Sequence, residues 1–226
     1  MRLPNEDQIG RFVLSAVFFF FALAALGRLA LLFDDPRPGD EQWALDVVTR
    51  LTSYIFMMLV VATTVMRLPA RRTAQGIEPR VSAIIGSFAI LTLVVLPTGD
   101  LGVAAKFIGS VLVLTGTALS VYCLAWLGRS FSVMAHARRL VTGGPYAVVR
   151  HPLYGAEMIT LAGLGISNYS PAALAVIALT VAFQFRRMYN EERVLRAEFP
   201  EYGAYAGSVP LIIPGFAGFG AGSQAD

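Results

Sequence analysis

The segment Arg150-His151-Pro152-Leu153-Tyr154 places three polar side chains immediately before an apolar stretch. Proline suits the first turn of a helix, where its missing N–H costs nothing, so a helix is expected to begin at Pro152. The free N–H groups and positive dipole end of such a helix would favour a carboxylate or phosphate beside His151. Anchoring at a membrane interface by arginine, histidine and tyrosine is the alternative interpretation.

Carboxylates and an arginine follow at spacings that a helix would bring together. Glu157 lies inside the apolar stretch, where a carboxylate is costly unless it is partnered or faces a polar cavity. If the later polar segment is helical, Arg187 and Glu191 share one face and the adjacent Glu192 points to another. The alternative for this segment is a solvated helix that carries a surface ion pair.

Two further segments could enclose a ligand. The segment from Leu140 to Tyr146 contains Gly143-Gly144-Pro145, a turn in which backbone N–H groups can approach a ligand closely, although such a turn is common in loops. Near the end of the chain, Val209–Pro214 is an extended apolar strip that either lies on the membrane or covers a pocket.

Apolar helices must position these segments, because the composition is that of a membrane protein. The chain is 56% hydrophobic and 15% charged, whereas soluble domains carry about 25% charged residues. A helical span needs about 20 residues. We predict an all-α membrane protein with five to six transmembrane helices, of which the last two form a short hairpin. The apolar stretches that support this prediction are Ile9–Phe33, Leu51–Met66, Val81–Pro97, Val103–Leu127, Leu153–Asn168 and Pro171–Phe185.

The polar segments divide the chain into regions. Residues 1–127 are predicted to be membrane helices, residues 128–215 to carry the site, and the Gly/Ala-rich residues 216–226 to form a flexible tail. Arginines gather at the N-terminus and after the second, fourth and sixth stretches, whereas the opposite side is acidic. Because short cytoplasmic loops hold the excess of Arg and Lys, we predict that both termini and the polar segments of the candidate site face the cytoplasm.

Charge and cysteine usage exclude other classes of protein. The net charge of +3 is small and no basic stripe stands apart from the membrane segments, so no nucleic-acid partner is expected. Cys123 is the only cysteine, which rules out an intramolecular disulfide and a multi-cysteine zinc site. With two histidines in addition, no metal centre is expected.

Four segments in order resemble the motifs of the isoprenylcysteine carboxyl methyltransferase family and its bacterial relatives, and more distantly those of the phospholipid N-methyltransferases. The family pattern is roughly a Leu-Val-Thr-x-Gly-x-Tyr turn, Arg-His-Pro-x-Tyr, a hydrophobic hairpin, Glu-Glu-x-x-Leu and Tyr-x-x-Tyr-x-x-x-Val-Pro. Each motif is weak alone, but the four in this order are specific. They correspond here to Leu140–Tyr146, Arg150–Tyr154, Glu191–Leu195 and Tyr202–Pro210.

The resemblance extends from near Phe131 to Pro214 and includes three departures. Gly155-Ala156-Glu157 stands where the family often has Leu-Gly-Glu, and Phe199-Pro200 stands where it has Phe-Gly. Leu211 replaces an arginine that often follows the Val-Pro pair, so any role of that arginine is absent. None of these departures removes a residue expected to hold the cofactor.

The resemblance implies an S-adenosylmethionine cofactor and a lipophilic small-molecule or lipidated substrate within membrane lipids. It places Arg187 at the substrate, and a thiol or amine acceptor could pass its proton to Glu157 or Glu192. The cofactor's ribose hydroxyls suit a carboxylate such as Glu191, and its sulfonium suits tyrosine faces. The implied cofactor residues are His136, Leu140, Val141, Tyr146, His151, Pro152, Leu153, Tyr154 and Glu191.

Two alternative functions remain at this point. A relative from the bacterial inner membrane could methylate a phospholipid amine or a small thiol in place of an isoprenylcysteine-type carboxylate. A non-catalytic transporter or structural protein is the alternative from another class. A transporter would favour two related halves with polar groups near the membrane midplane, whereas this chain shows no clear repeat and its polar groups gather at one interface.

Overall fold

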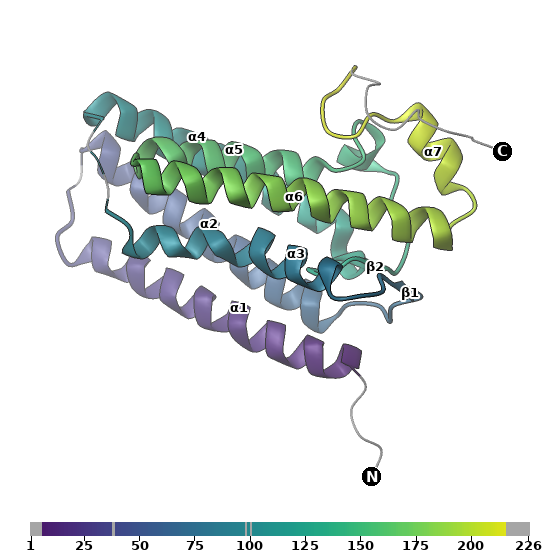
Figure 1. Ribbon diagram of the computed structural model, residues 1–226. Helices are drawn as coiled ribbons and strands as arrows, with labels where there is room; N and C mark the ends of the chain where they lie inside the picture. Colours follow the sequence, from purple (N-terminus) through teal and green to yellow (C-terminus); the bar gives the residue numbers. More distant parts are fainter. Residues whose placement is uncertain (1–5, 38, 98, 100, 216–226) are drawn as a thin grey trace, which may run out of the picture.

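The computed structural model describes residues 6–37, 39–97, 99 and 101–215 as an elongated helical bundle (Figure 1). Short 3-10 helices and two two-residue strands connect the α-helices. In chain order the elements are α1 (Glu6–Ala30), η1 (Leu31–Phe33), α2 (Glu41–Val65), β1 (Arg72–Thr73), α3 (Glu78–Phe88), η2 (Ala89–Val95), α4 (Val103–Leu127), η3 (Gly128–Ser130), β2 (His136–Ala137), η4 (Gly144–Ala147), α5 (Pro152–Ser167), α6 (Pro171–Glu198) and α7 (Tyr202–Ser208).

Within the described part of the chain, four helices are long and apolar enough to cross a membrane: α1 with η1, α2, α4 with η3, and α6. The prediction of an all-α membrane protein is therefore confirmed, and four of the described helices reach full span length where five to six transmembrane helices were expected. The predicted third span is interrupted, because α3 ends at Phe88 and the chain tightens into the 3-10 helix η2. Helix α5 has 16 residues, fewer than the roughly 20 that a span needs.

Helix α6 contains both the last apolar stretch and the polar segment after it, which were predicted as separate segments. The apolar stretch predicted to end at Phe185 continues without a break through the polar segment to Glu198. Ser170 caps the start of the helix by accepting the N–H of Ala173, and the helix ends where Phe199 becomes extended before Pro200. Side chains deep in the bundle and side chains at its end therefore lie on one rigid helix.

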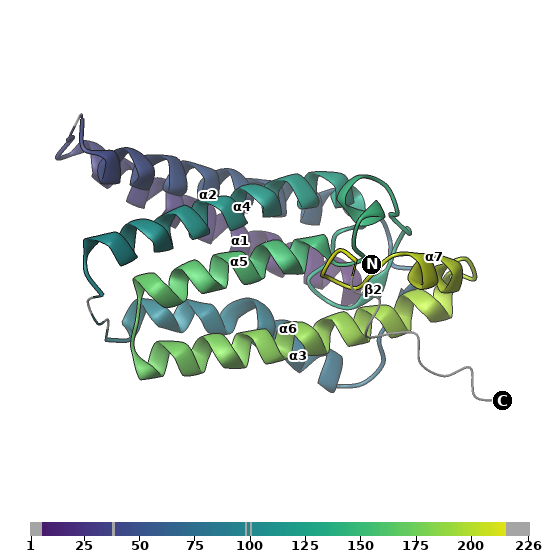
Figure 2. The same cartoon turned by 90° about the horizontal axis from the view of Figure 1, so that it is seen from above.

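Small residues allow α4 and α5 to pack with their backbones in contact. A Cβ atom on Gly116 would lie 2.5 Å from the backbone nitrogen of Thr160, and one on Gly163 would lie 2.6 Å from the carbonyl oxygen of Gly109. Close approach through glycine is typical of helix pairs in membranes, where van der Waals contact replaces the hydrophobic effect. Helix α3 lies beside α6 in both views of the bundle (Figure 1 and Figure 2).

The end of the bundle at which α5 begins and α6 ends is called the polar end. The antiparallel strands β1 and β2 connect the loop after α2 to the loop after α4 there, and α7 lies at the same end (Figure 1). Arg11 donates to the carbonyl oxygens of Val65 and Arg67, and Arg129 donates to that of Met66. The arginine-bearing segments thus meet at one end, as predicted; the flexible tail predicted for residues 216–226 lies outside the described residues.

Replacing Gly116 with alanine is expected to destabilise the bundle, because the new methyl group overlaps the backbone of Thr160. Overpacking of this kind costs about 1–3 kcal/mol, so thermal unfolding in detergent, followed by circular dichroism, should show a lower Tm. Gly27→Ala is the matched control, since a Cβ atom there meets nothing within 4 Å. Equal Tm values for the two variants would contradict the close packing of α4 against α5.

Candidate active site

A cavity of about 500 Å³ lies inside the bundle and reaches the polar end. This volume is within the range of about 300–1,000 Å³ that ligand pockets occupy. Of the predicted site residues, Pro152 and Glu192 are not among the described residues that line it. The predicted residues that do line it are His136, Leu140, Val141, Tyr146, His151, Leu153, Tyr154, Glu157, Arg187 and Glu191.

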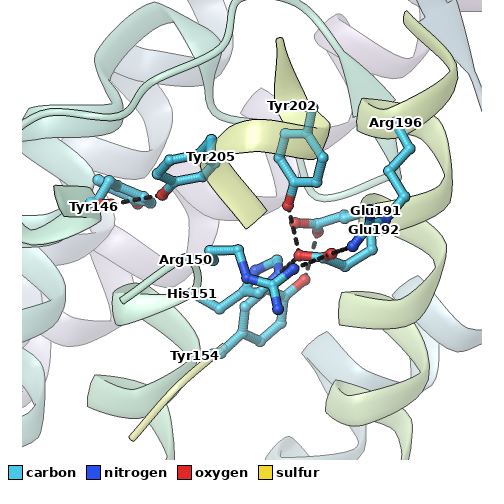
Figure 3. Close-up of polar contacts among 9 residues, drawn as sticks. All are labelled: Tyr146, Arg150, His151, Tyr154, Glu191, Glu192, Arg196, Tyr202 and Tyr205. Atoms are coloured by element: carbon cyan, nitrogen blue, oxygen red, sulfur yellow. Dashed lines mark hydrogen bonds and ion pairs between the residues drawn. The ribbon is translucent and has the colours of Figure 1, made fainter. Parts of the chain in front are cut away.

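Helices α5 and α6 form one polar wall of the cavity through side chains three and four residues apart, which share a helix face. The hydroxyl of Tyr154 donates to Glu191 Oε1 at 2.5 Å (Figure 3). The guanidinium of Arg187 lies over the ring of Tyr154, 5.0 Å from its centroid. Deeper in the bundle, Gln184 Nε2 donates to Glu157 Oε2 at 2.9 Å.

Glu192 joins three elements outside this wall (Figure 3). Its carboxylate accepts hydrogen bonds from Arg150, from the hydroxyl of Tyr202 at 2.5 Å and from Arg196 at 3.5 Å. The Nε2 atom of His151 lies 2.9 Å from Glu192 Oε1. The carboxylate of Glu192 is paired with these partners and is not among the described side chains that line the cavity, and its role as a proton acceptor for the substrate stays a prediction.

The start of α5 is covered by the C-terminal strip. The N–H of Arg150 donates to the carbonyl oxygen of Pro210 at 2.8 Å, and the N–H of His151 donates to that of Leu211 at 2.9 Å. These two amides, on the N-cap residue and the residue before it, are therefore not available to an anion beside His151. Pro152 occupies the first position of α5, as predicted, but it shapes the helix start and does not face the cavity.

Three tyrosines enclose the polar end of the cavity. The hydroxyl of Tyr205 donates to the carbonyl oxygen of Tyr146 at 2.5 Å, and the hydroxyl of Tyr146 donates to that of Cys123 at 3.4 Å. Burial raises the pKa of Tyr205 to about 12 and raises the pKa values of Tyr146 and Tyr202 further above their ordinary value. All three phenols therefore stay neutral at pH 7 and present donors and ring faces.

Arg187 is one of the buried arginines that line the cavity, and it is 8% exposed. One of its terminal nitrogens donates to the carbonyl oxygen of Val133 at 3.3 Å, while Nε is buried with no hydrogen-bond partner. A guanidinium has five N–H donors in a planar fork that matches a carboxylate or phosphate. Arg187 therefore has the capacity to bind an anionic group inside the cavity.

Gly86 of α3 makes the room that Arg187 occupies. A Cβ atom on Gly86 would lie 2.8 Å from the Cδ atom of Arg187 and 3.4 Å from the carbonyl carbon of Phe183. Sequence reasoning did not identify Gly86, and its only signal was an isolated glycine in an apolar stretch. Its place shows that the first half of the chain positions a side chain of the second half.

Sequence reasoning also missed the apolar walls and two of the tyrosines. Tyr202 and Tyr205 were noted as motif residues only, yet both line the cavity. Helices from the first half, predicted only as membrane spans, supply much of the inner wall. An apolar side chain on a membrane helix carries no sequence signal that separates a cavity wall from a lipid-facing surface. These wall residues are Phe18, Phe56, Met57, Val60, Ile90 and Val113.

Known proteins are similar to part of the chain. The family model described as phospholipid methyltransferase matches residues 103–202. A cobalt-zinc-cadmium resistance protein of Cupriavidus metallidurans is 38% identical over 96 residues, which cover 40% of this chain and 44% of the relative. Protein-S-isoprenylcysteine O-methyltransferase B of Arabidopsis thaliana is 31% identical over 113 residues, which cover 47% of this chain and 57% of the relative.

The fold defines an all-α membrane protein, and residues 103–202 of this chain match the phospholipid methyltransferase family model. The family model and the plant relatives support the isoprenylcysteine and phospholipid methyltransferase-like family, as the order of motifs predicted. The chain spans about half the length of the curated relatives that it matches. Among the residues that the structure describes, no group of three or more His, Cys, Asp or Glu side chains could hold a metal ion.

The adjacent glutamates should differ in their effect on stability. Glu192→Ala leaves the guanidinium of Arg150, whose side chain is 3% exposed, without its carboxylate partner. Breaking a buried ion pair in this way costs about 3–5 kcal/mol. Glu191→Ala is the matched control, because Glu191 accepts a hydrogen bond from the neutral Tyr154 hydroxyl. Thermal unfolding in detergent should show the larger loss for Glu192→Ala, and the reverse order would contradict the role given to Glu192.

Proposed function

We propose that this chain is an integral membrane methyltransferase that uses S-adenosylmethionine to methylate a lipophilic substrate. The observation that carries the proposal is the two-part cavity. Its polar end gathers Glu191, His151 and the tyrosines, and its inner part has apolar walls. Arg187 lies between the two parts. A water-soluble cofactor and the apolar tail of a lipid can therefore meet in one enclosure.

The residues at the polar end fit the chemical groups of S-adenosylmethionine. Arg150 lines the cavity and has a buried Nε with no hydrogen-bond partner, which suits a carboxylate. Glu191 accepts from Tyr154 on one oxygen, and an ionised carboxylate has about four lone-pair sites, so it can also accept from ribose hydroxyls. The faces of Tyr146 and Tyr205 suit the adenine ring, and aromatic faces attract a sulfonium by cation–π interaction.

When bound, S-adenosylmethionine supplies a methyl group on a sulfonium sulfur, which becomes a neutral thioether when a nucleophile takes the methyl. The chain's own contribution is positioning, which can be worth effective molarities of about 10⁵–10⁸ M. Arg187 would hold an anionic acceptor, and the apolar walls would exclude water from it. A carboxylate acceptor needs no base at pH 7, whereas a thiol or amine must lose a proton, for which Glu157 is the carboxylate inside the cavity.

The site would face the cytoplasm from the inner membrane of a bacterium. The arginine-bearing segments meet at the polar end, and the opposite end carries Asp34, Asp35 and Asp40. Arginine excess marks the cytoplasmic side of a membrane protein. The cytoplasmic side is also where a cell keeps S-adenosylmethionine, so this orientation gives the cofactor direct access to the polar end.

A phospholipid amine is the second candidate substrate, because the matched family model is described as phospholipid methyltransferase. The carboxylate of an isoprenylcysteine-type lipid is favoured by Arg187, whose donors suit an anionic acceptor better than an amine. Incubating the purified protein with a labelled methyl donor and each class of lipid distinguishes them. A non-catalytic protein would transfer no label to any acceptor.

Cofactor binding should depend on Glu191. Isothermal titration of S-adenosylmethionine into the protein in nanodiscs should give saturable binding. Glu191→Ala should weaken the affinity about tenfold or more, because a tenfold loss corresponds to about 1.4 kcal/mol and the loss of a hydrogen bond to a charged group costs about that much. Glu201→Ala is the control, since Glu201 is exposed and its side chain is not part of the described cavity lining. Absence of saturable binding by the wild-type protein would refute the proposed function.

Gly86→Ala should impair the substrate side of the site and spare the cofactor side. The added methyl group overlaps Arg187 Cδ and would push the guanidinium out of place. We expect KM for the methyl acceptor to rise about tenfold, which corresponds to about 1.4 kcal/mol, with unchanged cofactor affinity. Gly10→Ala is the control, because a Cβ atom there makes an ordinary 3.7 Å contact. Equal KM values for both variants would show that Gly86 does not position Arg187.

A further inference from the structure

Trp126 packs against the turn that carries Tyr146, although it is not among the described residues that line the cavity. It lies in the last turn of α4 and is 47% exposed. A Cβ atom on Gly144, the first residue of η4, would lie 2.5 Å from Cε2 and 2.8 Å from Cε3 of the indole. A Cβ atom on Gly143 would lie 3.5 Å from Cζ3 of the same ring. The indole therefore lies directly against the backbone of the two-glycine turn.

Gly144 meets two separate requirements at this turn. Its φ of +61° lies in the left-handed region, which glycine adopts without a steric cost. Any Cβ atom would also overlap the indole, since non-bonded carbon atoms pack at about 3.5–4.0 Å. The first requirement belongs to the turn itself, whereas the second exists only because Trp126 is present.

A second contact from the same side of α4 holds η4. The hydroxyl of Tyr146 donates to the carbonyl oxygen of Cys123, which lies three residues before Trp126 and therefore on the same helix face. The N–H of Tyr146 donates to the carbonyl oxygen of Gly143 at 3.2 Å. Its own carbonyl oxygen accepts from Tyr205 of α7 (Figure 3). The 7% exposed ring of Tyr146 is thus placed by a short turn held between α4 and α7.

We infer that Trp126 is a positioning residue for the cofactor. It acts by holding η4, and with it Tyr146 and the preceding Leu140 and Val141, at the wall of the cavity. The inference rests on the proposed function, because these three lining residues are the ones expected to contact the cofactor. A tryptophan that only anchors a helix end at the membrane interface would leave the turn and its ligand unaffected.

A double-mutant cycle tests the contact between the indole and the turn. The readout is the Kd of S-adenosylhomocysteine, measured by isothermal titration to the full chain in nanodiscs. Trp126→Ala should weaken binding about tenfold. Gly144→Ala should weaken binding more in the wild-type background than in the Trp126→Ala background, because the cost of the positive φ is common to both and the clash is present in only one. We expect the two effects to differ about fivefold or more.

Two further variants separate positioning from general stability. Trp126→Phe keeps an aromatic ring over the turn and should bind the cofactor more tightly than Trp126→Ala. Trp43→Ala is the matched control, because Trp43 is the only other tryptophan and its Nε1 donates to Leu32 at the opposite end of the bundle. This control should leave the Kd unchanged, and its effect should add to that of Gly144→Ala without coupling. If Trp126→Ala does not fold, Trp126→Leu takes its place in the cycle.

The emission of Trp126 offers a signature that does not depend on a loss of binding. In the Trp43→Phe protein, all tryptophan emission comes from Trp126. Titration with S-adenosylhomocysteine should change this emission saturably, with a midpoint equal to the Kd from calorimetry. The Trp126→Phe protein, in which only Trp43 emits, should show no change at the same ligand concentrations.

The outcomes separate the inference from the proposed function. If S-adenosylhomocysteine does not bind the wild-type protein, both fail. If it binds, three results overturn the inference alone: an unchanged Kd in Trp126→Ala, an equal effect of Gly144→Ala in both backgrounds, or constant Trp126 emission up to saturation with the ligand.

Discussion

The carboxylate of Glu192 is the contact on which the site depends. It connects the start of α5, the end of α6 and the start of α7 through Arg150, His151 and Tyr202. Each of these groups would be costly to bury near a membrane without a charged partner. Because one carboxylate pairs with all three groups, the adjacent Glu191 is left to accept the Tyr154 hydroxyl and to line the cavity (Figure 3).

The continuity of α6 then determines what the cavity can bind. A helix rises about 1.5 Å per residue, so Glu191, Arg187 and Gln184 stand at increasing depth on one rigid wall. Helix α5 faces them with Tyr154 and Glu157. Polar groups at increasing depth would allow one enclosure to hold the proposed nucleotide-like cofactor at its polar end and a lipid in its interior. The first half of the chain completes the enclosure by packing α3 against α6 and by supplying apolar walls.

Much of this arrangement could be predicted from local signals. Pro152 marked the start of a helix, long apolar runs marked α1 and α4, and the spacing of Arg187 and Glu191 predicted a shared face. The features that could not be predicted from the sequence depend on tertiary contacts. The sequence does not tell which of two adjacent glutamates will face a cavity, since that depends on where Arg150 and Tyr202 are folded.

Backbone pairing and close packing were equally invisible to sequence reasoning. The strip at Pro210 and Leu211, more than fifty residues away, accepts the N–H groups of Arg150 and His151, and no local signal indicated this pairing. The role of Gly86 follows from a clash that exists only after α3 meets Arg187. The length of α6 was underestimated because its apolar and polar halves have different compositions although one backbone continues through both.

The proposed cofactor site is a single enclosure. Its one side is formed by η4 and the start of α5, and its other side by the end of α6. An experimental structure of the full chain with S-adenosylhomocysteine tests it most directly. The account predicts density for the ligand in contact with Tyr146, His151 and Glu191, with its sulfur directed toward Arg187. Ligand density at any other place on the protein, with this cavity filled by lipid alone, would contradict it.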